Sequence, residues 1–491
     1  MKKLVLILMA VLFSVGLIAQ ERIEPSWESI DARPIPEWFS DAKFGIFIHW
    51  GPYSVPAWTP KGTYTEWYQY WLQSKSLFGN GDFSGSEVVD FHNKRYGEDY
   101  SYYKFGEEFK AELYNADDWA DLFEKSGAKY VVPTSKHHDG YCLWPNETAN
   151  KTWGFPWNSM EVGSKRDLIG ELNEAVRKTS VRMGMYYSIY EWFNPFYKTD
   201  FDRFVTEHYH PQFKDLVNRY KPDLIFVDGA WDHPAEKWKT FDLLTWLFND
   251  SGSSKDLVIN DRWGKDTRFK HAGYYTAEYD PNFEADFPWE ECRGMGFSFG
   301  YNRAEDAWDY NSPQVLVLML VDIVSRGGNL LLDIGPDADG KIPAIMQDRL
   351  LAMGDWLRVN GEAIYGTRKY KRTSQWSAGR TDYPEDQSHY KSAEYVLKQT
   401  VNPDEGFAVK EIFFTHKPGA LYCIMPKYPK ESIVIKDIHP DSSAKITMLG
   451  LNLALNWVRT KDGIRVEVPA LVPGEIPCQH AWTLKIASSE F

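Results

Sequence analysis

The side chains best suited to chemistry in this sequence come after short apolar runs. Imidazoles, carboxylates and one guanidinium occupy these places: His49, His137, His138, Asp228, Arg262 and Glu278, with Glu290 a little further along the chain. Such groups bind metals or act as acids, bases and nucleophiles. Each has a structural explanation when taken alone, because aspartates close turns and exposed arginines pair with nearby acids. Together they mark the carboxyl ends of predicted strands as the candidate site.

A metal centre is one interpretation of the histidines. His49, His137, His138 and Asp228 could supply the ligands of a mononuclear site. Adjacent histidines on a strand point to opposite faces, however, and no His-x-His pair is present. No GxGxxG or Walker pattern supports a nucleotide-binding fold either. We therefore expect a site that works without a metal ion and without a cofactor.

Strand-like apolar runs alternate with helix-like stretches over residues 44–365. Asn115, for example, can cap a helix that places Trp119 and Phe123 on one face. Repeated strand–helix units of this number predict an α/β fold, a (β/α)8-like barrel over residues 20–366, rather than an open sheet. The predicted strands are Phe44–Ile48, Tyr130–Ser135, Met183–Ser188, Leu224–Asp228, Leu257–Asn260 and Asn329–Ile334.

The composition changes after Gly366. Residues 369–405 are polar and are interpreted as a linker with irregular strands. From Val409 onward, short alternating runs separated by Gly, Pro and Asp turns predict a small antiparallel β-sandwich. We expect a linker and this second domain over residues 367–491. Its role is expected to be structural rather than carbohydrate-binding, because no exposed aromatic platform is recognisable. The predicted strands are Ile412–Phe414, Leu421–Ile424, Ser432–Ile435 and Arg465–Val468.

The N-terminus has the layout of an export signal. Residues 1–3 carry charge and residues 4–18 form an apolar run too short to span a bilayer, so we expect a signal peptide over residues 1–19 and a periplasmic or secreted protein. No later run predicts membrane insertion. The formal net charge of −14 argues against nucleic acid as a partner. The four cysteines lie far apart and are interpreted as isolated thiols or at most one bridge. No feature predicts an oligomeric state.

Seven short motifs follow one another along the chain. They are FGIFIHWG at 44–51, YSVPA at 53–57, EWY at 66–68, KHHDG at 136–140, NDRWG at 260–264, SFGYN at 298–302 and GGNLLL at 327–332. This set resembles, in the same order, the motifs of the α-L-fucosidases of glycoside hydrolase family 29. The resemblance covers about two thirds of the chain, and an ordered set of this kind is highly specific. It implies a barrel enzyme that removes terminal fucose from oligosaccharides or glycoconjugates.

The resemblance also implies roles for single residues. Asp228 is implied as the nucleophile and Glu278 of the Thr-Ala-Glu-Tyr segment as the acid/base, with Glu290 as the alternative. Phe226 stands where the family usually carries Trp, so a stacking surface is retained and an indole hydrogen bond is lost. The implied ligands of the fucose hydroxyls are His49, Glu66, Trp67, His137, His138, Tyr187 and Arg262, and the implied apolar wall for the C6 methyl is Phe47 and Phe299.

Hydrolysis with retention needs two carboxyl groups about 5 to 5.5 Å apart. Asp228 would attack the anomeric carbon as the anion, while Glu278 would protonate the leaving oxygen. L-Galactose differs from L-fucose by a hydroxyl group on C6. Because an apolar wall discriminates only weakly against one added hydroxyl, some activity on α-L-galactosides is expected. Three alternatives stay open: a lectin-like protein without activity, a metal-dependent hydrolase, and a strict α-L-galactosidase on the same scaffold.

Overall fold

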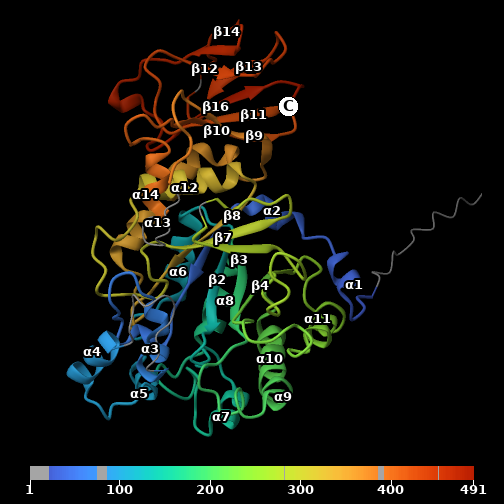
Figure 1. The fold of residues 1–491 in the computed structure, drawn as a ribbon, viewed down its shortest axis with the longest axis vertical. Helices are drawn as coiled ribbons and strands as arrows, with labels where there is room; N and C mark the ends of the chain where they lie inside the picture. The colour runs from blue at the N-terminus through green and yellow to red at the C-terminus, as the bar shows by residue number, and fades with distance from the viewer. Residues whose placement is uncertain (1–21, 75–85, 281, 385–391, 452) are drawn as a thin grey trace, which may run out of the picture.

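Eight parallel strands form one curled sheet in the computed structural model, in the order β5-β4-β3-β2-β1-β8-β7-β6 (Figure 1). A single parallel bridge between Asn260 and Tyr274 joins β5 to β6, so the ring closes weakly at this seam. The predicted (β/α)8-like barrel is thus confirmed. The strands are β1 Phe44–Ile48, β2 Tyr130–Lys136, β3 Arg182–Ser188, β4 Leu224–Asp228, β5 Val258–Ile259, β6 Tyr275–Glu278, β7 Trp289–Gly294 and β8 Asn329–Ile334.

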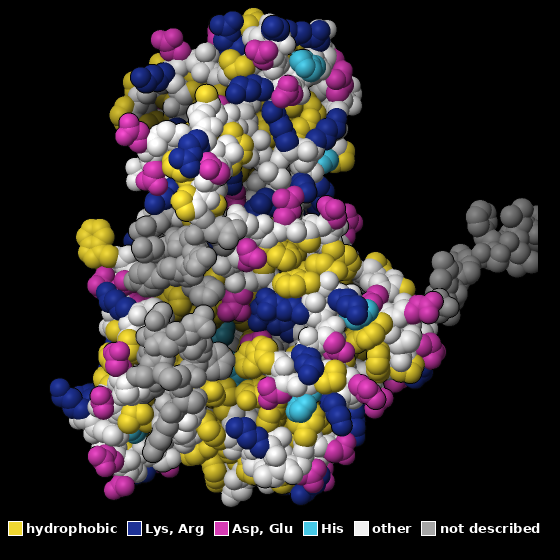
Figure 2. Space-filling view, viewed as in Figure 1, with side chains coloured by type: hydrophobic (Ala, Val, Ile, Leu, Met, Phe, Trp, Pro, Cys, Tyr) yellow, Lys and Arg dark blue, Asp and Glu magenta, His cyan; other side chains and the backbone are white. Residues whose placement is uncertain are grey.

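The structure describes residues 22–74, 86–280, 282–384, 392–451 and 453–491. The predicted signal peptide, residues 1–19, therefore lies outside the described residues. No helix in the described ranges is long and apolar enough to cross a membrane. In Figure 2 acidic and basic side chains are interspersed over the visible face of the molecule.

Helices follow β1 to β4, β7 and β8. Asn115 caps α6 as predicted, because its side chain accepts the backbone N–H groups of Asp117 and Asp118. The described residues that connect β5 to β6 and β6 to β7 contain no helix. The main helices are α6 Ala116–Lys125, α8 Leu168–Val176, α10 His210–Tyr220, α11 Thr240–Asn249, α12 Pro313–Ser325 and α13 Ala344–Asn360.

Shorter helices fill the connections and the start of the chain. One of them, η3, is a π-helix that runs directly into α10. These elements are α1 Trp27–Asp31, α2 Glu37–Ala42, α3 Tyr68–Ser74, α4 Ser86–Tyr96, α5 Tyr103–Glu108, α7 Glu147–Trp153, α9 Phe201–Arg203, η1 Pro52–Ser54, η2 Thr65–Trp67, η3 Phe204–Tyr209 and η4 Gly361–Ala363.

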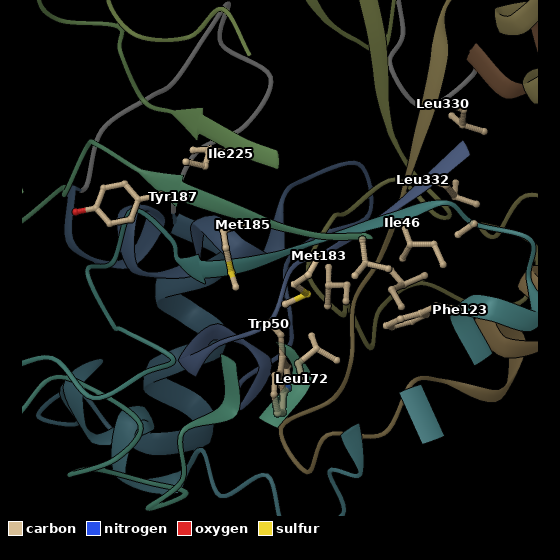
Figure 3. Packing of buried hydrophobic residues seen from close by; sticks show 14 of the residues in the cluster. Ile46, Trp50, Phe123, Leu172, Met183, Met185, Tyr187, Ile225, Leu330 and Leu332 are labelled. Atoms are coloured by element: carbon tan, nitrogen blue, oxygen red, sulfur yellow. The ribbon is translucent and has the colours of Figure 1, made fainter. Parts of the chain in front are cut away.

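The barrel strands are buried on both faces and alternate between two cores. Met183, Met185 and Tyr187 of β3 belong to the outer core beneath the helices, together with Ile225 of β4, the register partner of Met185 (Figure 3). Tyr186 and Phe226 belong to the inner core of the barrel. This inner core includes Phe39 and Ala42 of α2, the helix that comes just before β1.

The C-terminal residues form two antiparallel sheets, which confirms the predicted β-sandwich strands. One sheet has the order β13-β16-β11-β10-β9 and the other β12-β15-β14. The elements are β9 Arg368–Trp376, α14 Ser392–Lys398, β10 Lys410–Lys417, β11 Ala420–Met425, β12 Ser432–Lys436, β13 Lys445–Met448, β14 Trp457–Thr460, β15 Gly463–Glu467, η6 Pro473–Glu475 and β16 Trp482–Ala487. All four cysteines are free thiols, so no bridge joins the two domains.

Helix α12 joins the barrel to the C-terminal sheet. It contacts β8 of the barrel as well as β9, β10 and α14, and residues 315–325 are all buried. Within this contact Asp322 pairs with Lys410 Nζ of β10 at 2.6 Å and with Arg326 Nη2 at 2.9 Å. Although burial alone would raise it, the two cations lower the pKa of Asp322 to about 2.

We predict that Asp322→Asn lowers the thermal unfolding midpoint at pH 7. The substitution leaves two partly buried cations without their counter-charge, and breaking such a pair costs about 3–5 kcal/mol. Because the folded pKa of Asp322 is depressed, its contribution is present above about pH 4 and is lost as the pH falls toward 2. The difference between wild type and variant should therefore vanish over that interval. Asp355→Asn is the control, because Asp355 pairs with Arg358 on the exposed face of α13 and should change the midpoint little.

Candidate active site

A cavity of about 310 Å³ opens at the carboxyl ends of the barrel strands. This volume is at the lower end of the range for small-molecule pockets and suits one small ring rather than a chain of rings. The lining side chains come from strand ends and from the loops that follow them. They are Phe47, His49, Tyr64, Glu66, Trp67, His137, His138, Tyr186, Phe226, Asp228, Trp231, Arg262, Arg268, Glu278, Cys292 and Phe299.

Asp228 ends β4 with its carboxylate in the cavity. Arg262 Nη1 donates to its Oδ1 at 2.9 Å, and the Tyr186 hydroxyl donates to its Oδ2 at 3.1 Å. Directly after it, Gly229 has φ +90°, and a Cβ there would lie 2.5 Å from Cβ of Tyr190. Only glycine lets the chain turn away from the strand end so closely. Hydrogen bonds from Arg262 and Tyr186 thus hold the Asp228 carboxylate, and the turn at Gly229 follows directly after it.

Arg262 holds two carboxylates with one guanidinium. Besides Asp228, it contacts Glu278 at the end of β6, with 3.2 Å between Nη2 and Oε2. Its Nε donates to Thr276 Oγ1 at 2.8 Å, and Thr276 donates in turn to Asp261. Burial opposes its charge, but Asp228 and Glu278 hold the pKa of Arg262 well above its ordinary value. The planar Arg262 guanidinium therefore contacts the Asp228 and Glu278 carboxylates at the same time.

The His49 imidazole is oriented by Asp333 of β8. Its Nδ1 lies 2.6 Å from Asp333 Oδ1. Burial lowers the pKa of His49. Burial raises the pKa of Asp333, and the nearby charge of Glu66 raises the pKa of Asp333 further. Both shifts favour the neutral forms of the two groups. The hydrogen bond to Asp333 fixes the orientation of the His49 ring, whose other nitrogen, Nε2, remains for a ligand.

The His138 imidazole is oriented by Ser188. Its Nδ1 lies 2.5 Å from Ser188 Oγ, and Nε2 lies 3.6 Å from Asp228 Oδ2. Burial lowers the pKa of His138 well below its usual value, which favours the neutral ring. His49 and His138 thus line the cavity as two oriented imidazoles whose neutral forms are favoured.

Glu66 supplies a carboxyl oxygen to the cavity. Its Oε2 accepts the Gly300 N–H at 2.8 Å and the Ser298 hydroxyl at 3.2 Å. Its Oε1 has no partner among the described residues. Burial raises the pKa of Glu66 to about 7. This group can therefore accept or donate a hydrogen bond near neutral pH.

Behind the histidines lies a buried ion cluster. Glu191 Oε1 contacts Lys136 Nζ at 2.5 Å and His208 Nε2, carried by the π-helix η3, at 2.6 Å. Although burial alone would raise it, His208 and Lys136 lower the pKa of Glu191 to about 2. Lys136 ends β2 just before His137, so this cluster fixes the turn that carries both cavity histidines.

Among the predicted site residues, Tyr187 and the alternative acid Glu290 do not line the cavity. Tyr187 lies on the outer face of β3 and donates to Gln212, because side chains alternate along a strand and Tyr186 takes the inner face. The structure therefore does not bring Tyr187 to the cavity. Glu290 is buried beside two tyrosines, whose hydroxyls donate to it: Tyr130 at 2.5 Å and Tyr274 at 3.0 Å.

The expectation that the His137 and His138 side chains point to opposite faces of a strand is wrong. Strand β2 ends at Lys136, so both rings belong to the following turn, and alternation does not separate them. Their centroids lie 4.2 Å apart and both line the cavity. Within the described ranges, no group of three or more His, Cys, Asp or Glu side chains could hold a metal ion.

Two family models match the chain. The model "Alpha-L-fucosidase" matches residues 10–362, and the model "Alpha-L-fucosidase C-terminal domain" matches residues 405–487. Tissue alpha-L-fucosidase of Rattus norvegicus is 38% identical over 492 residues, which cover 98% of this chain and 96% of the relative.

Solved structures agree with these matches. The structure of Thermotoga maritima alpha-fucosidase in complex with fucose is 34% identical, with a TM-score of 0.74 over 95% of this chain and 100% of the other. The same enzyme in complex with a mechanism-based inhibitor is 34% identical, with a TM-score of 0.75 and the same coverage of both chains.

We predict that Glu191→Gln destabilises the protein by about 3–5 kcal/mol, because it leaves the Lys136 ammonium buried without a counter-charge. Adding Lys136→Met should recover part of this loss, because the double variant buries no uncompensated cation. Chemical denaturation of the single and double variants at pH 7 measures both values. A Glu191→Gln variant as stable as wild type would contradict this role of the cluster.

Proposed function

This chain belongs to the α-L-fucosidase family of glycoside hydrolases, and on that basis we propose that it removes terminal α-L-fucose from glycans with retention of configuration. One observation carries the proposal. Asp228 and Glu278 share the Arg262 guanidinium in one small cavity, which suits the short carboxyl separation of a retaining enzyme. The substrate would be a fucosylated oligosaccharide or glycoconjugate.

Asp228 is proposed as the nucleophile. In the first step its carboxylate attacks the anomeric carbon, the bond to the leaving oxygen breaks, and a fucosyl ester forms. The donors Arg262 and Tyr186 support this role because they hold the attacking carboxylate in place and stabilise its charge. In the second step water attacks the same carbon and releases Asp228.

Glu278 is proposed as the acid and base. It gives its proton to the leaving oxygen in the first step and takes one from water in the second. Its side chain is 29% exposed at the mouth of the cavity, where a leaving group passes. Glu290, in contrast, is fully buried and held by two tyrosine hydroxyls. Access therefore favours Glu278 over Glu290.

The shape of the cavity supports action at chain ends on a 6-deoxy sugar. The deep lining residues are buried, so one terminal ring fits and the rest of a glycan stays outside. Phe47 lies 5.0 Å from Phe226 and 6.3 Å from Phe299, measured between ring centroids. These rings form an apolar surface suited to a methyl group. Export of the chain, predicted from residues 1–19, is part of the same proposal.

We predict that Asp228→Gly lowers turnover by about 10³-fold or more, because no covalent intermediate can form. Added azide should restore turnover by attacking from the vacated side, and NMR should show a β-L-fucosyl azide. Asp232→Gly is the control, because Asp232 follows the same turn but does not line the cavity, and it should keep its turnover without azide. An azide product that kept the α configuration would contradict the role of Asp228.

We predict that Glu278→Ala lowers kcat/KM by about 10²–10⁴-fold for a fucosyl disaccharide and far less for an aryl α-L-fucoside with a good leaving group. Only the poor leaving group needs the proton. Kinetics on both substrates give the ratio of the two kcat/KM values, and Glu290→Gln should keep the wild-type ratio. If the Glu290 variant showed the selective loss and the Glu278 variant did not, the acid would have to be reassigned.

A further inference from the structure

A few of the side chains that line the cavity are exposed to solvent, and these mark its mouth. Most of the lining is buried, whereas Tyr64, Trp67 and Glu278 are partly exposed and Trp231 and Arg268 are exposed. A leaving group attached to a sugar in the cavity must pass these side chains. Since Glu278 is proposed to protonate the leaving oxygen, the first ring beyond that oxygen would lie at the same opening.

Trp231 is the large apolar side chain most open to solvent in the cavity lining. Its exposure is 45%, although it comes only three residues after Asp228. The turn at Gly229 carries it from the strand end to the mouth. Beside the cavity, an exposed indole offers a flat apolar surface to a ligand that enters through the mouth.

The Trp231 ring is held by other rings. Its centroid lies 5.0 Å from that of His138, 5.5 Å from that of Tyr190 and 5.8 Å from that of Trp67. These contacts fix the orientation of the indole before any ligand binds, which lowers the entropy cost of binding. Trp231 and Trp67 together form an aromatic surface that runs from the cavity to the solvent.

From this geometry we infer that Trp231 is a stacking platform for the first sugar ring of the leaving group. The flat apolar face of a pyranose ring matches an exposed indole, and the ring hydroxyls remain in water. Trp231 would then select leaving groups that contain a sugar over leaving groups without a ring. This inference rests on the proposed function, because it needs a fucosyl unit in the cavity.

The test compares two substrates that share the fucosyl unit. A fucosyl disaccharide offers a ring to Trp231, whereas α-L-fucosyl fluoride has a single atom as its leaving group. We expect Trp231→Ala to lower the ratio of kcat/KM for the disaccharide to kcat/KM for the fluoride by about tenfold or more. Trp231→Phe, which keeps a ring, should retain most of the wild-type ratio.

Trp308→Ala is the matched control. Trp308 is 95% exposed but does not line the cavity, so its loss should leave the ratio unchanged. An unchanged ratio in Trp231→Ala, with wild type active on both substrates, would overturn the platform and leave the proposed function intact. A wild-type protein inactive on both substrates would overturn both.

Discussion

The site depends on one buried cation that serves two carboxylates. Arg262 is costly to bury, and its charge is compensated only because Asp228 and Glu278 approach it from different strands. Its orientation comes from Thr276, from Asp261 behind Thr276, and from the Phe226 ring beneath the guanidinium at 5.1 Å. Arg262 therefore sets the placement of the Asp228 and Glu278 carboxylates relative to each other.

Near Arg262, the cavity is lined by two histidines whose neutral forms are favoured. Burial favours neutral His49 and His138, and hydrogen bonds to Asp333 and Ser188 orient the two rings. A neutral imidazole has one donor and one acceptor nitrogen, so it can form a hydrogen bond with a sugar hydroxyl, which is itself both a donor and an acceptor. The full charges of the Glu191 cluster lie behind the cavity and fix the loops.

Much of the fold could be predicted from the sequence, because six of the barrel strands coincide with apolar runs of the chain. Strands β6 and β7 could not be predicted because both carry glutamates and because the described residues between them contain no helix. Tyr187 was chosen instead of Tyr186 because a motif does not show which face a residue takes, although period-two alternation with Met183 and Met185 could have decided it. Asp333 could not be recognised as a site residue because it lies inside an apolar run, which predicts only a buried strand.

The single bridge between β5 and β6 has a consequence for how such a site can change over time. Asp228 lies on a strand that is paired on both sides, whereas Glu278 lies beside the weakest seam of the barrel. The described residues that connect β5 to β6 and β6 to β7 contain no helix. Insertions and deletions are tolerated best in such loops. During evolution the chain position of the carboxylate at Asp228 should therefore be preserved, whereas that of the carboxylate at Glu278 can shift along the chain.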